Sequence, residues 1–413
     1  MKILIVTQYF WPENFRINDF IPELIAKGHE VKILTGKPNY PIGKIFPEFS
    51  ENPKSFSHFK GADVLRVPIV SRGNHSIKLF LNYLSFVISG LLIAPWKLRK
   101  FNPDVIFVYE PSPVTVGIPA VFLGKLKKSP VIFWALDLWP ETLQAVGGIQ
   151  SRFILFVIER IVRLIYNNCS LVLGQSKSFV KSIKTHCDYP ERVKYFPSWS
   201  EKLPNFQDQN NLNYAPEIHR NDQNFNILFA GNIADAQDIP AILNTAKRLK
   251  DKNHIKWIFI GDGRRFEWFK SEVQRMKLDE SFIILGRFPF ERMPSFFAHA
   301  DALLVSLKKD PVFSMTIPAK LQTYLNTGIP ILGMLDGEGA KIIEESNSGI
   351  CCPASDSESL ARSIIQMSEL SKTEKDQLGK NGIDYSKKEF DRSMLMDRLE
   401  NFFIDSVINY NKS

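Results

Sequence analysis

Residues 2–36 read KILIVTQYFWPENFRINDFIPELIAKGHEVKILTG, and this stretch decides the fold. Residues 2–7 form a short apolar run that predicts a strand. Residues 17–28 space their apolar side chains as an amphipathic helix that ends at Gly28. Residues 30–36 predict the next strand. Continuously apolar strands separated by helices are typical of a parallel sheet that is buried on both faces.

The same strand–helix unit recurs along the whole chain. Further strands are predicted at 64–70, 104–110, 131–137, 171–176, 225–232, 255–263, 281–287, 302–307, 329–335 and 349–352. Residues 201–224 are rich in Asn, Asp, Gln and Pro and lack an apolar period, so they predict a linker. The chain is therefore expected to be an α/β protein with two doubly wound domains. Ligands of such sheets bind at the carboxyl ends of the strands, and the crevice between two domains is the default site.

Composition excludes several classes of protein. The 413 residues are 44% hydrophobic and 23% charged, which argues against a mostly disordered, collagen-like or polytopic membrane protein. The four cysteines form neither a disulfide framework nor a zinc motif, which is typical of a reducing compartment. The apolar run at the N-terminus is too short for a signal peptide, so a cytoplasmic location is expected.

Basic residues concentrate in the first half of the chain. Residues 1–200 contain 25 Lys and Arg against 14 Asp and Glu, an excess of 25 − 14 = 11, whereas the whole chain carries +8. This excess is compatible with an anionic partner or with an ordinary solvated surface.

Two segments of this basic half raise the question of a membrane. Leu79–Trp96 carries no charge over 18 residues, which is the lower limit for a membrane span. We reject a span, because it would separate the strand at 104–110 from the strand at 2–7 with which it must share a sheet. The segment is then a buried helix that covers the sheet or a helix in the membrane interface. Residues 152–166 interleave Arg with large apolar side chains, a pattern that suits an anionic bilayer surface.

A lysine stands at the start of a predicted helix in residues 317–333. Pro318 fits the first helical turn, Thr316 or Ser314 is expected to cap it, and Gly328 ends the helix. Lys320 then lies in the first turn, where the helix dipole disfavours a cation. An anion bound at the same place would explain the lysine. The alternative is that Lys320 extends into water and has no function.

Glycine turns end two predicted strands of the second half, and glycine lets backbone approach a ligand closely. The residues concerned are Gly231 and Asn232 in one turn, and Gly261, Gly263, Arg264 and Arg265 in the other. The two arginines could reach a phosphate. Each turn alone is more typical of a tight connection, but several on one sheet edge favour a phosphate site. The chain contains neither the GxGxxG fingerprint nor the P-loop motif.

Acidic and basic candidates also occur in the first half. Asp137 and Glu141 follow a buried strand, where a carboxylate can act in acid–base catalysis, bind a sugar hydroxyl or simply cap the next helix. Arg16 begins the first helix and is a second candidate for phosphate contact. No Asp-x-Asp and no His/Cys cluster with metal spacing occurs, so phosphate charge is expected to be stabilised by Lys, Arg and helix dipoles.

The segments PDVIFVYEPSP (103–113), DLWPETL (137–143), LFAGNIADAQDIPAIL (228–243) and FSMTIPAKLQTYLNTGIPIL (313–332) carry a family resemblance. The chain resembles the retaining family-4 glycosyltransferases of the GT-B fold, in particular the bacterial O-antigen and colanic-acid branch of L-fucosamine transferase-like proteins. That fold consists of two Rossmann-like domains that face each other across a cleft.

The resemblance implies how the chain is divided. Residues 1–200 would form the acceptor-binding domain, 201–224 the linker and 225–385 the nucleotide-sugar domain, and 386–413 would be a helical segment that returns to the first domain.

The resemblance also implies the activity. A sugar would be transferred with retention from a nucleotide-sugar donor. The donor is expected to be UDP-linked, and a candidate for its sugar is an N-acetyl-6-deoxyhexosamine such as L-fucosamine. The acceptor would be a lipid-linked saccharide in surface polysaccharide or O-antigen biosynthesis, at the inner face of the plasma membrane. No cofactor, no metal and no nucleic acid is implied.

The sequence departs from the family at several positions. The two family glutamates fall on Met315 and Thr323, the usual basic pair falls on Asn232 and Gln237, and the usual His falls on Leu136. Lys320 is then the expected substitute for the missing basic pair.

The implied catalytic residues are Asp137, Glu141 and Lys320. The implied donor contacts are Arg16, Gly231, Asn232, Gly261, Gly263, Arg264, Pro318, Lys320, Thr323, Gly337 and Glu338. Two alternatives stay open, a nucleotide-sugar 2-epimerase and a non-catalytic sugar-nucleotide-binding partner of a polysaccharide complex. Donor sugar, base, acceptor, linkage and oligomeric state do not follow from the sequence.

Overall fold

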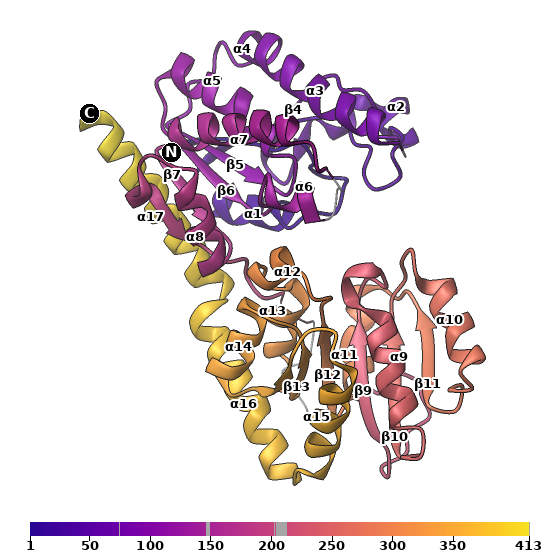
Figure 1. The fold of residues 1–413 in the computed structure, drawn as a ribbon. Helices are drawn as coiled ribbons and strands as arrows, with labels where there is room; N and C mark the ends of the chain where they lie inside the picture. The colour runs from indigo at the N-terminus through magenta and orange to yellow at the C-terminus, as the bar shows by residue number, and fades with distance from the viewer. Residues whose placement is uncertain (74, 146–148, 202, 204–212, 413) are drawn as a thin grey trace. The chain divides into compact units, whose positions relative to one another are not determined.

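The computed structural model describes residues 1–73, 75–145, 149–201, 203 and 213–412, which fall into two compact units (Figure 1). Unit 1 consists of Met1–Pro197 and Ser393–Ser413, and unit 2 consists of Ser198–Arg392. Each unit is built on a parallel sheet with helices packed against it, which confirms the predicted fold class. Of the predicted linker, residues 202 and 204–212 lie outside the described residues.

The sheet of unit 1 has eight strands in the order β3-β4-β2-β1-β5-β6-β7-β8. All neighbours are parallel except β3 and β4. The strands are β1 (Lys2–Val6), β2 (Glu30–Thr35), β3 (His58–Phe59), β4 (Ala62–Arg66), β5 (Val105–Glu110), β6 (Val131–Ala135), β7 (Leu171–Gly174) and β8 (Val193–Tyr195). The strand order reverses between β1 and β5, so ligands are expected beyond their carboxyl ends.

The helices of unit 1 cover this sheet. They are α1 (Ile17–Ala26), α2 (Pro47–Glu51), α3 (Ser76–Leu92), α4 (Ala94–Lys97), α5 (Gly117–Lys127), α6 (Glu141–Ala145), α7 (Arg152–Asn167), α8 (Lys177–Thr185) and α17 (Arg392–Lys412). Helix α3 packs closely on α5 at Gly90, where an added Cβ would lie 2.7 Å from the Cβ of Pro119. The C-terminal helix α17 completes the core, because the ring of Phe403 packs 5.4 Å from that of Phe107 on β5.

The uncharged segment Leu79–Trp96 forms most of α3 and the short α4. Its Asn82, Phe86 and Gly90 are buried, so the segment does cover the sheet. Its other face exposes large apolar side chains, including Phe80 and Leu92 at 63% and 74% exposure. The buried face agrees with a helix that covers the sheet, and the exposed apolar face is compatible with a helix in the membrane interface. Within the described ranges, no helix combines the length and apolar character that crossing a membrane requires.

The sheet of unit 2 has six parallel strands in the order β11-β10-β9-β12-β13-β14. The strands are β9 (Phe225–Ala230), β10 (Ile255–Ile260), β11 (Phe282–Gly286), β12 (Ala302–Ser306), β13 (Ile331–Met334) and β14 (Gly349–Cys352). Stacked aromatic rings fill one layer of its core, among them Phe229, Phe259 and Phe269. The strand order reverses between β9 and β12.

The helices of unit 2 are α9 (Ile239–Arg248), α10 (Phe266–Arg275), α11 (Met293–Phe297), α12 (Pro311–Met315), α13 (Ala319–Leu325), α14 (Glu338–Ser346), α15 (Ser357–Glu369) and α16 (Lys372–Glu389). The predicted cap of the Lys320 helix is wrong. Ser314 lies inside α12 and Thr316 ends it, because Asp310 caps a separate helix there. Helix α13 begins after Pro318, which has no capping side chain.

Candidate functional site

The ammonium group of Lys320 lies at the point where the strand order of unit 2 reverses. Its Nζ lies 3.5 Å from the ring centroid of Phe229 on β9. A Cβ added to Gly231, just beyond β9, would lie 3.2 Å from the same Nζ. Lys320 therefore links the loop after β9 to the first turn of α13.

This ammonium nitrogen is buried and has no hydrogen-bond partner among the described residues. Burial lowers the pKa of Lys320 to about 7. A contact between a cation and an aromatic face offsets part of the cost of losing water, but an ammonium has three N–H donors to satisfy. An anionic ligand would supply the missing acceptors.

The glycine loops after β9 and β10 pack backbone against backbone. A Cβ at Gly261 would lie 1.8 Å from the carbonyl oxygen of Gly231, and one at Gly263 would lie 2.2 Å from that of Ile233. Both glycines have positive φ, +140° and +157°. The Asn232 side chain lies on the same pair of loops, with its Oδ1 2.5 Å from the Cβ position of Gly263. The structure thus brings Gly231, Asn232, Gly261 and Gly263 together.

The two arginines after Gly263 differ in their surroundings. Arg264 is exposed. Arg265 pairs with Asp235 at 2.6 Å and stacks over the ring of Trp268. Of the two, Arg264 is the one whose side chain has no ion pair or ring contact among the described residues.

A second convergence involves the start of α14. Gly337 has φ +72°, and a Cβ there would lie 1.9 Å from the carbonyl oxygen of Ser314. Gly339 in the first turn of α14 approaches the ring of Pro318, with 3.3 Å between its Cβ position and the Pro318 Cδ. Glu338, which lies between these two glycines in the sequence, is buried. The predicted residues Pro318, Gly337 and Glu338 therefore lie close to one another.

Two predicted donor contacts are less favourably placed. The hydroxyl of Thr323 is buried and donates a 3.4 Å bond to the carbonyl of Ala319 in its own helix. Arg16 lies in unit 1 at the N-terminal end of α1, whereas the other predicted donor contacts lie in unit 2.

In unit 1, Asp137 follows β6, and its carboxylate is held by neighbours. The Thr142 hydroxyl donates to Asp137 Oδ1 at 2.6 Å, and the Trp139 indole donates to Oδ2 at 3.1 Å. The Asp137 backbone N–H donates to Glu110 Oε2 at 3.3 Å. This arrangement fixes the orientation of Asp137 at the carboxyl end of the sheet.

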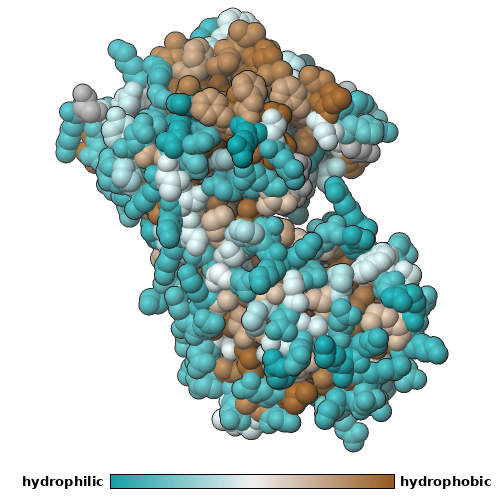
Figure 2. All heavy atoms as spheres, in the orientation of Figure 1, coloured by the Kyte–Doolittle hydropathy of each residue, from teal (hydrophilic) through white to brown (hydrophobic). Residues whose placement is uncertain are grey.

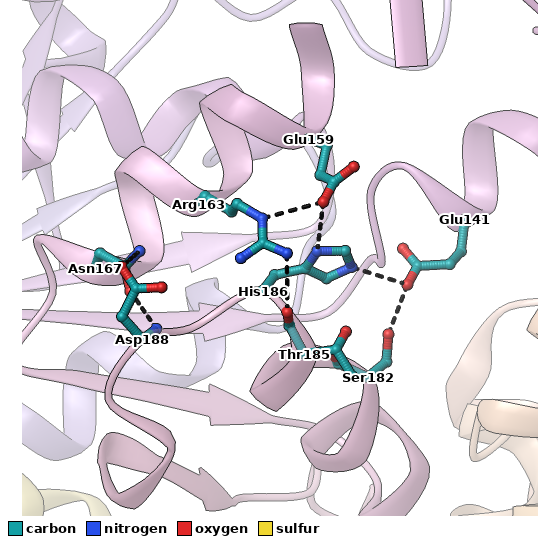
Figure 3. Close-up of polar contacts among 8 residues, drawn as sticks. All are labelled: Glu141, Glu159, Arg163, Asn167, Ser182, Thr185, His186 and Asp188. Carbon is teal, nitrogen blue, oxygen red and sulfur yellow. Dashed lines mark hydrogen bonds and ion pairs between the residues drawn. The ribbon is translucent and has the colours of Figure 1, made fainter. Parts of the chain in front are cut away.

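The second predicted carboxylate, Glu141, is held by polar neighbours. Its Oε1 accepts a 2.6 Å bond from the Ser182 hydroxyl and lies 3.4 Å from Nε2 of His186 (Figure 3). His186 also lies 3.8 Å from Glu159 on α7. Despite the cost of burial, these hydrogen bonds keep the pKa of Glu141 below its usual value. These contacts link α6 to α8, and the catalytic role of Glu141 stays a prediction.

Sequence reasoning missed Glu110, which is fully buried at the end of β5. Burial, with the nearby Asp137 charge second, raises the pKa of Glu110 well above its usual value. Its Oε1 has no partner among the described residues. The signal was available, since a carboxylate that ends a continuously apolar strand is unusual.

A polar network at the ends of β1 and β2 was missed as well. The Glu13 carboxylate accepts backbone N–H bonds from Phe10, Asn39 and Tyr40 at 2.7–3.0 Å. Burial raises its pKa to about 7 even though these bonds oppose the shift. Asn82, a buried polar residue inside α3, accepts a 2.6 Å bond from the Gln8 side chain. A lone Asn in an uncharged helix was its sequence signal.

Metal ligands do not cluster in the part of the chain that the structure describes, where no group of three or more His, Cys, Asp and Glu side chains could hold an ion.

The second half of the chain is similar to a known family. Residues 212–385 match the family model "Glycosyl transferases group 1". The chain is 24% identical over 350 residues to "Putative colanic acid biosynthesis glycosyl transferase WcaI" of Escherichia coli (strain K12), covering 79% of this chain and 82% of that protein. It is 25% identical over 249 residues to "Probable glycosyltransferase WbjE" of Pseudomonas aeruginosa, covering 57% of this chain and 60% of that protein.

Solved structures match the fold over nearly the full length. HepE of Anabaena, in complex with UDP and glucose, has a TM-score of 0.66 at 12% identity and covers 98% of this chain and 100% of that one. WaaG, a glycosyltransferase involved in lipopolysaccharide biosynthesis, has a TM-score of 0.65 at 14% identity and covers 98% and 99%. The fold is GT-B, and the match to the glycosyltransferase group 1 model falls within unit 2.

Proposed function

We propose that this protein transfers a sugar from a nucleotide-sugar donor, bound by unit 2, to a lipid-linked saccharide acceptor, bound by unit 1, in bacterial surface polysaccharide or O-antigen assembly. The observation that carries the proposal is the buried, unpartnered ammonium of Lys320 within the glycosyltransferase group 1 domain. The names of WcaI and WaaG support the pathway class. The HepE complexes with UDP support a UDP-linked donor, and L-fucosamine is a candidate sugar.

In the proposed reaction, Lys320 holds the donor diphosphate and stabilises the charge that develops on it as the sugar leaves. A preorganised charge in a water-excluded site is worth far more than one in solvent. The glycines at 231, 261 and 263 let backbone approach the nucleotide, while Arg264, Asn232 and the start of α14 complete the donor contacts. Asp137 orients a sugar hydroxyl. The leaving phosphate accepts the acceptor proton on the same face, so the transfer is retaining and requires no metal.

Transfer is tested by incubating the purified protein with labelled UDP-sugars and membranes that carry lipid-linked acceptors. We expect the label to move into lipid, and EDTA to leave the initial rate almost unchanged. Loss of the rate with EDTA and its rescue by Mg²⁺ would overturn the metal-free mechanism. Interconversion of the sugar without transfer would instead indicate an epimerase, and donor binding without turnover a non-catalytic partner.

We further propose that unit 1 associates peripherally with an anionic membrane. Brown, apolar side chains gather over unit 1 in Figure 2, in the region where Figure 1 draws α3, α4, α5 and α7. Many large apolar side chains on these helices are at least 40% exposed. They are Ile77, Phe80, Leu81, Leu84, Ile88, Leu92, Trp96, Phe122, Leu126, Phe153, Ile154, Phe156, Val157 and Leu164. We call this set the apolar surface. Contiguous exposed apolar area of this kind marks an interaction site.

Binding to vesicles should depend on the apolar surface. The double variant Phe80→Ser and Phe153→Ser removes two side chains that are 63% and 76% exposed. Because each ring loses about 1 kcal/mol of favourable burial in the bilayer interface, we expect vesicle affinity to fall at least tenfold. The matched control is Ile404→Ser with Ile408→Ser on α17, outside the apolar surface, which should change little. Equal effects of the two pairs in a flotation assay would count against membrane docking through these helices.

A further inference from the structure

A basic groove lies in unit 1 between the end of α4 and the end of α5. It has a volume of about 500 Å³ and is lined by Pro95, Arg99, Asn102, Leu126, Lys127 and Lys128. Three of the six lining residues are cationic and none is acidic. None of the three cations has an ion pair with a carboxylate among the described residues. The groove therefore presents positive charge that is not paired with any carboxylate of the described residues.

Two of the three cationic side chains are held at the groove by contacts of their own. Lys127 Nζ donates to the carbonyl of Leu98 at 2.9 Å and to Asn102 Oδ1 at 3.2 Å. The guanidinium of Arg99 stacks 4.8 Å from the ring of Trp96 and donates to its carbonyl at 3.1 Å. An ammonium has three N–H donors and a guanidinium five, so both groups keep donors for a ligand. Their positions cost less entropy to fix because the protein already restricts them.

The groove opens at the border of the apolar surface. Leu126 lines the groove and is itself 52% exposed, and Trp96, the ring under Arg99, is 64% exposed. In a membrane, a tryptophan at this border lies at headgroup depth. Cations beside it would then lie level with lipid phosphates, which places opposite charges together.

A second groove nearby is less suited to an anion. It is lined by Lys2, Lys32, Lys97 and Lys100, among others, but also by Glu30 and Asp63. Lys32 is paired with Asp63 at 2.7 Å, so part of its charge is already neutralised. The groove at the end of α5 has no such competitor.

We propose that the groove of Arg99, Lys127 and Lys128 binds the phosphate of an anionic phospholipid headgroup. The proposal rests on the membrane association proposed above and adds a defined lipid site to it. Arg99 supplies a planar pair of N–H donors that matches two phosphate oxygens, and the lysines supply point charges. The acyl chains extend from the headgroup along the apolar surface.

The experiment compares two triple variants that lose the same charge. One is Arg99→Gln, Lys127→Gln and Lys128→Gln, in the groove. The control is Lys177→Gln, Lys181→Gln and Lys184→Gln, exposed lysines on α8. Affinities are measured for vesicles of phosphatidylcholine alone and with one-fifth phosphatidylglycerol at the same ionic strength, and thermal unfolding checks that both variants fold.

We expect the wild type to prefer the vesicles that contain phosphatidylglycerol. A charge near a membrane surface contributes roughly fivefold to such binding, so the groove variant should lose at least tenfold of the preference and the α8 variant less than threefold. Equal losses would mean diffuse attraction and no site. Suppression of wild-type vesicle binding by millimolar inorganic phosphate, beyond the effect of sulfate at matched ionic strength, would assign the groove to free phosphate. A concentration-dependent dimer that excludes vesicles would assign the surface to a second copy.

This experiment separates the lipid site from the proposed enzymatic function. The groove variant should retain full transfer to a water-soluble acceptor analogue, because none of its three residues belongs to the donor or acceptor contacts. If the wild type transfers no sugar to either acceptor, the enzymatic proposal fails whatever the vesicles show.

Discussion

Replacing Lys320 by alanine should lower kcat and kcat/KM together, by roughly 10²-fold or more. The ammonium is buried beside Gly231 and Phe229 and has no polar partner among the described residues, so its charge is available to the donor diphosphate. That charge contributes more as negative charge builds on the leaving group. The measurement is steady-state transfer with saturating acceptor.

The variant should remain folded. A buried ammonium without a partner costs stability, and its removal offsets the lost contact with the Phe229 ring. The matched control is Lys341→Ala on α14, an exposed lysine of the same unit that should leave the rates unchanged. A folded Lys320→Ala protein with near wild-type rates would falsify the assignment and direct attention to Arg264.

The same lysine should make donor binding depend on pH. Its pKa of about 7 in the free protein means that it is mostly neutral above pH 7, so a diphosphate must bind together with a proton. We expect UDP affinity, measured by calorimetry, to fall by up to tenfold per pH unit above 7, and this slope to vanish in Lys320→Ala.

The free energy of unfolding should change with pH in the opposite direction and rise above pH 7, because the unfolded lysine holds its proton up to its ordinary pKa. The cost of burying the charge is fully present below pH 7 and is relieved as pH rises above it.

Gly261→Ala should be the most destabilising single substitution in the donor loops. The new Cβ would meet the carbonyl oxygen of Gly231 at 1.8 Å, in a backbone with φ +140°. The backbone of Gly231 cannot move aside as a flexible side chain can. The cost of the steric overlap therefore adds to the cost of holding an alanine at positive φ. We expect a loss of about 3 kcal/mol or more in the free energy of unfolding of unit 2, measured with urea.

The control for this substitution is Gly286→Ala, in the strand that pairs with β10. Gly286 also has positive φ, +76°, but its nearest neighbour would be the Phe266 Cζ at 3.8 Å. It should therefore show the backbone strain alone, about 1–2 kcal/mol. Similar losses for both variants would mean that the loops after β9 and β10 separate easily, and that their close packing does not shape the nucleotide site.

The fold was predictable because it depends on a local pattern. Residues 3–6 are apolar and form most of the interior strand β1, where all four are buried. The start of the Lys320 helix was predictable to within a residue or two from Pro318. Its cap was not, since Asp310 begins a separate helix α12 immediately before it, and a short helix leaves little periodic signal.

The surroundings of the site residues were not predictable, because they come from distant parts of the chain. Lys320 meets Phe229 across a separation of 91 residues, and only the strand order brings them together. Glu141 was predicted to be catalytic because it is a carboxylate that follows a buried strand in the sequence. Its partner His186 follows 45 residues later, and no local pattern in the sequence indicates that contact. A residue type at a strand end thus predicts which chemistry a side chain can perform, whereas its contacts depend on residues far away in the sequence.

Unit 1 is discontinuous in sequence, since residues 198–392 are inserted between its sheet and helix α17. During synthesis, the ribosome delivers the whole of unit 2 before it delivers Leu395, Leu399 and Phe403, which complete the core of unit 1. Until then, Phe107 on β5 lacks the ring of Phe403 that packs against it in the complete unit. Closure of the unit 1 core by α17 therefore follows the synthesis of unit 2, in contrast to the usual N-terminal-first sequence.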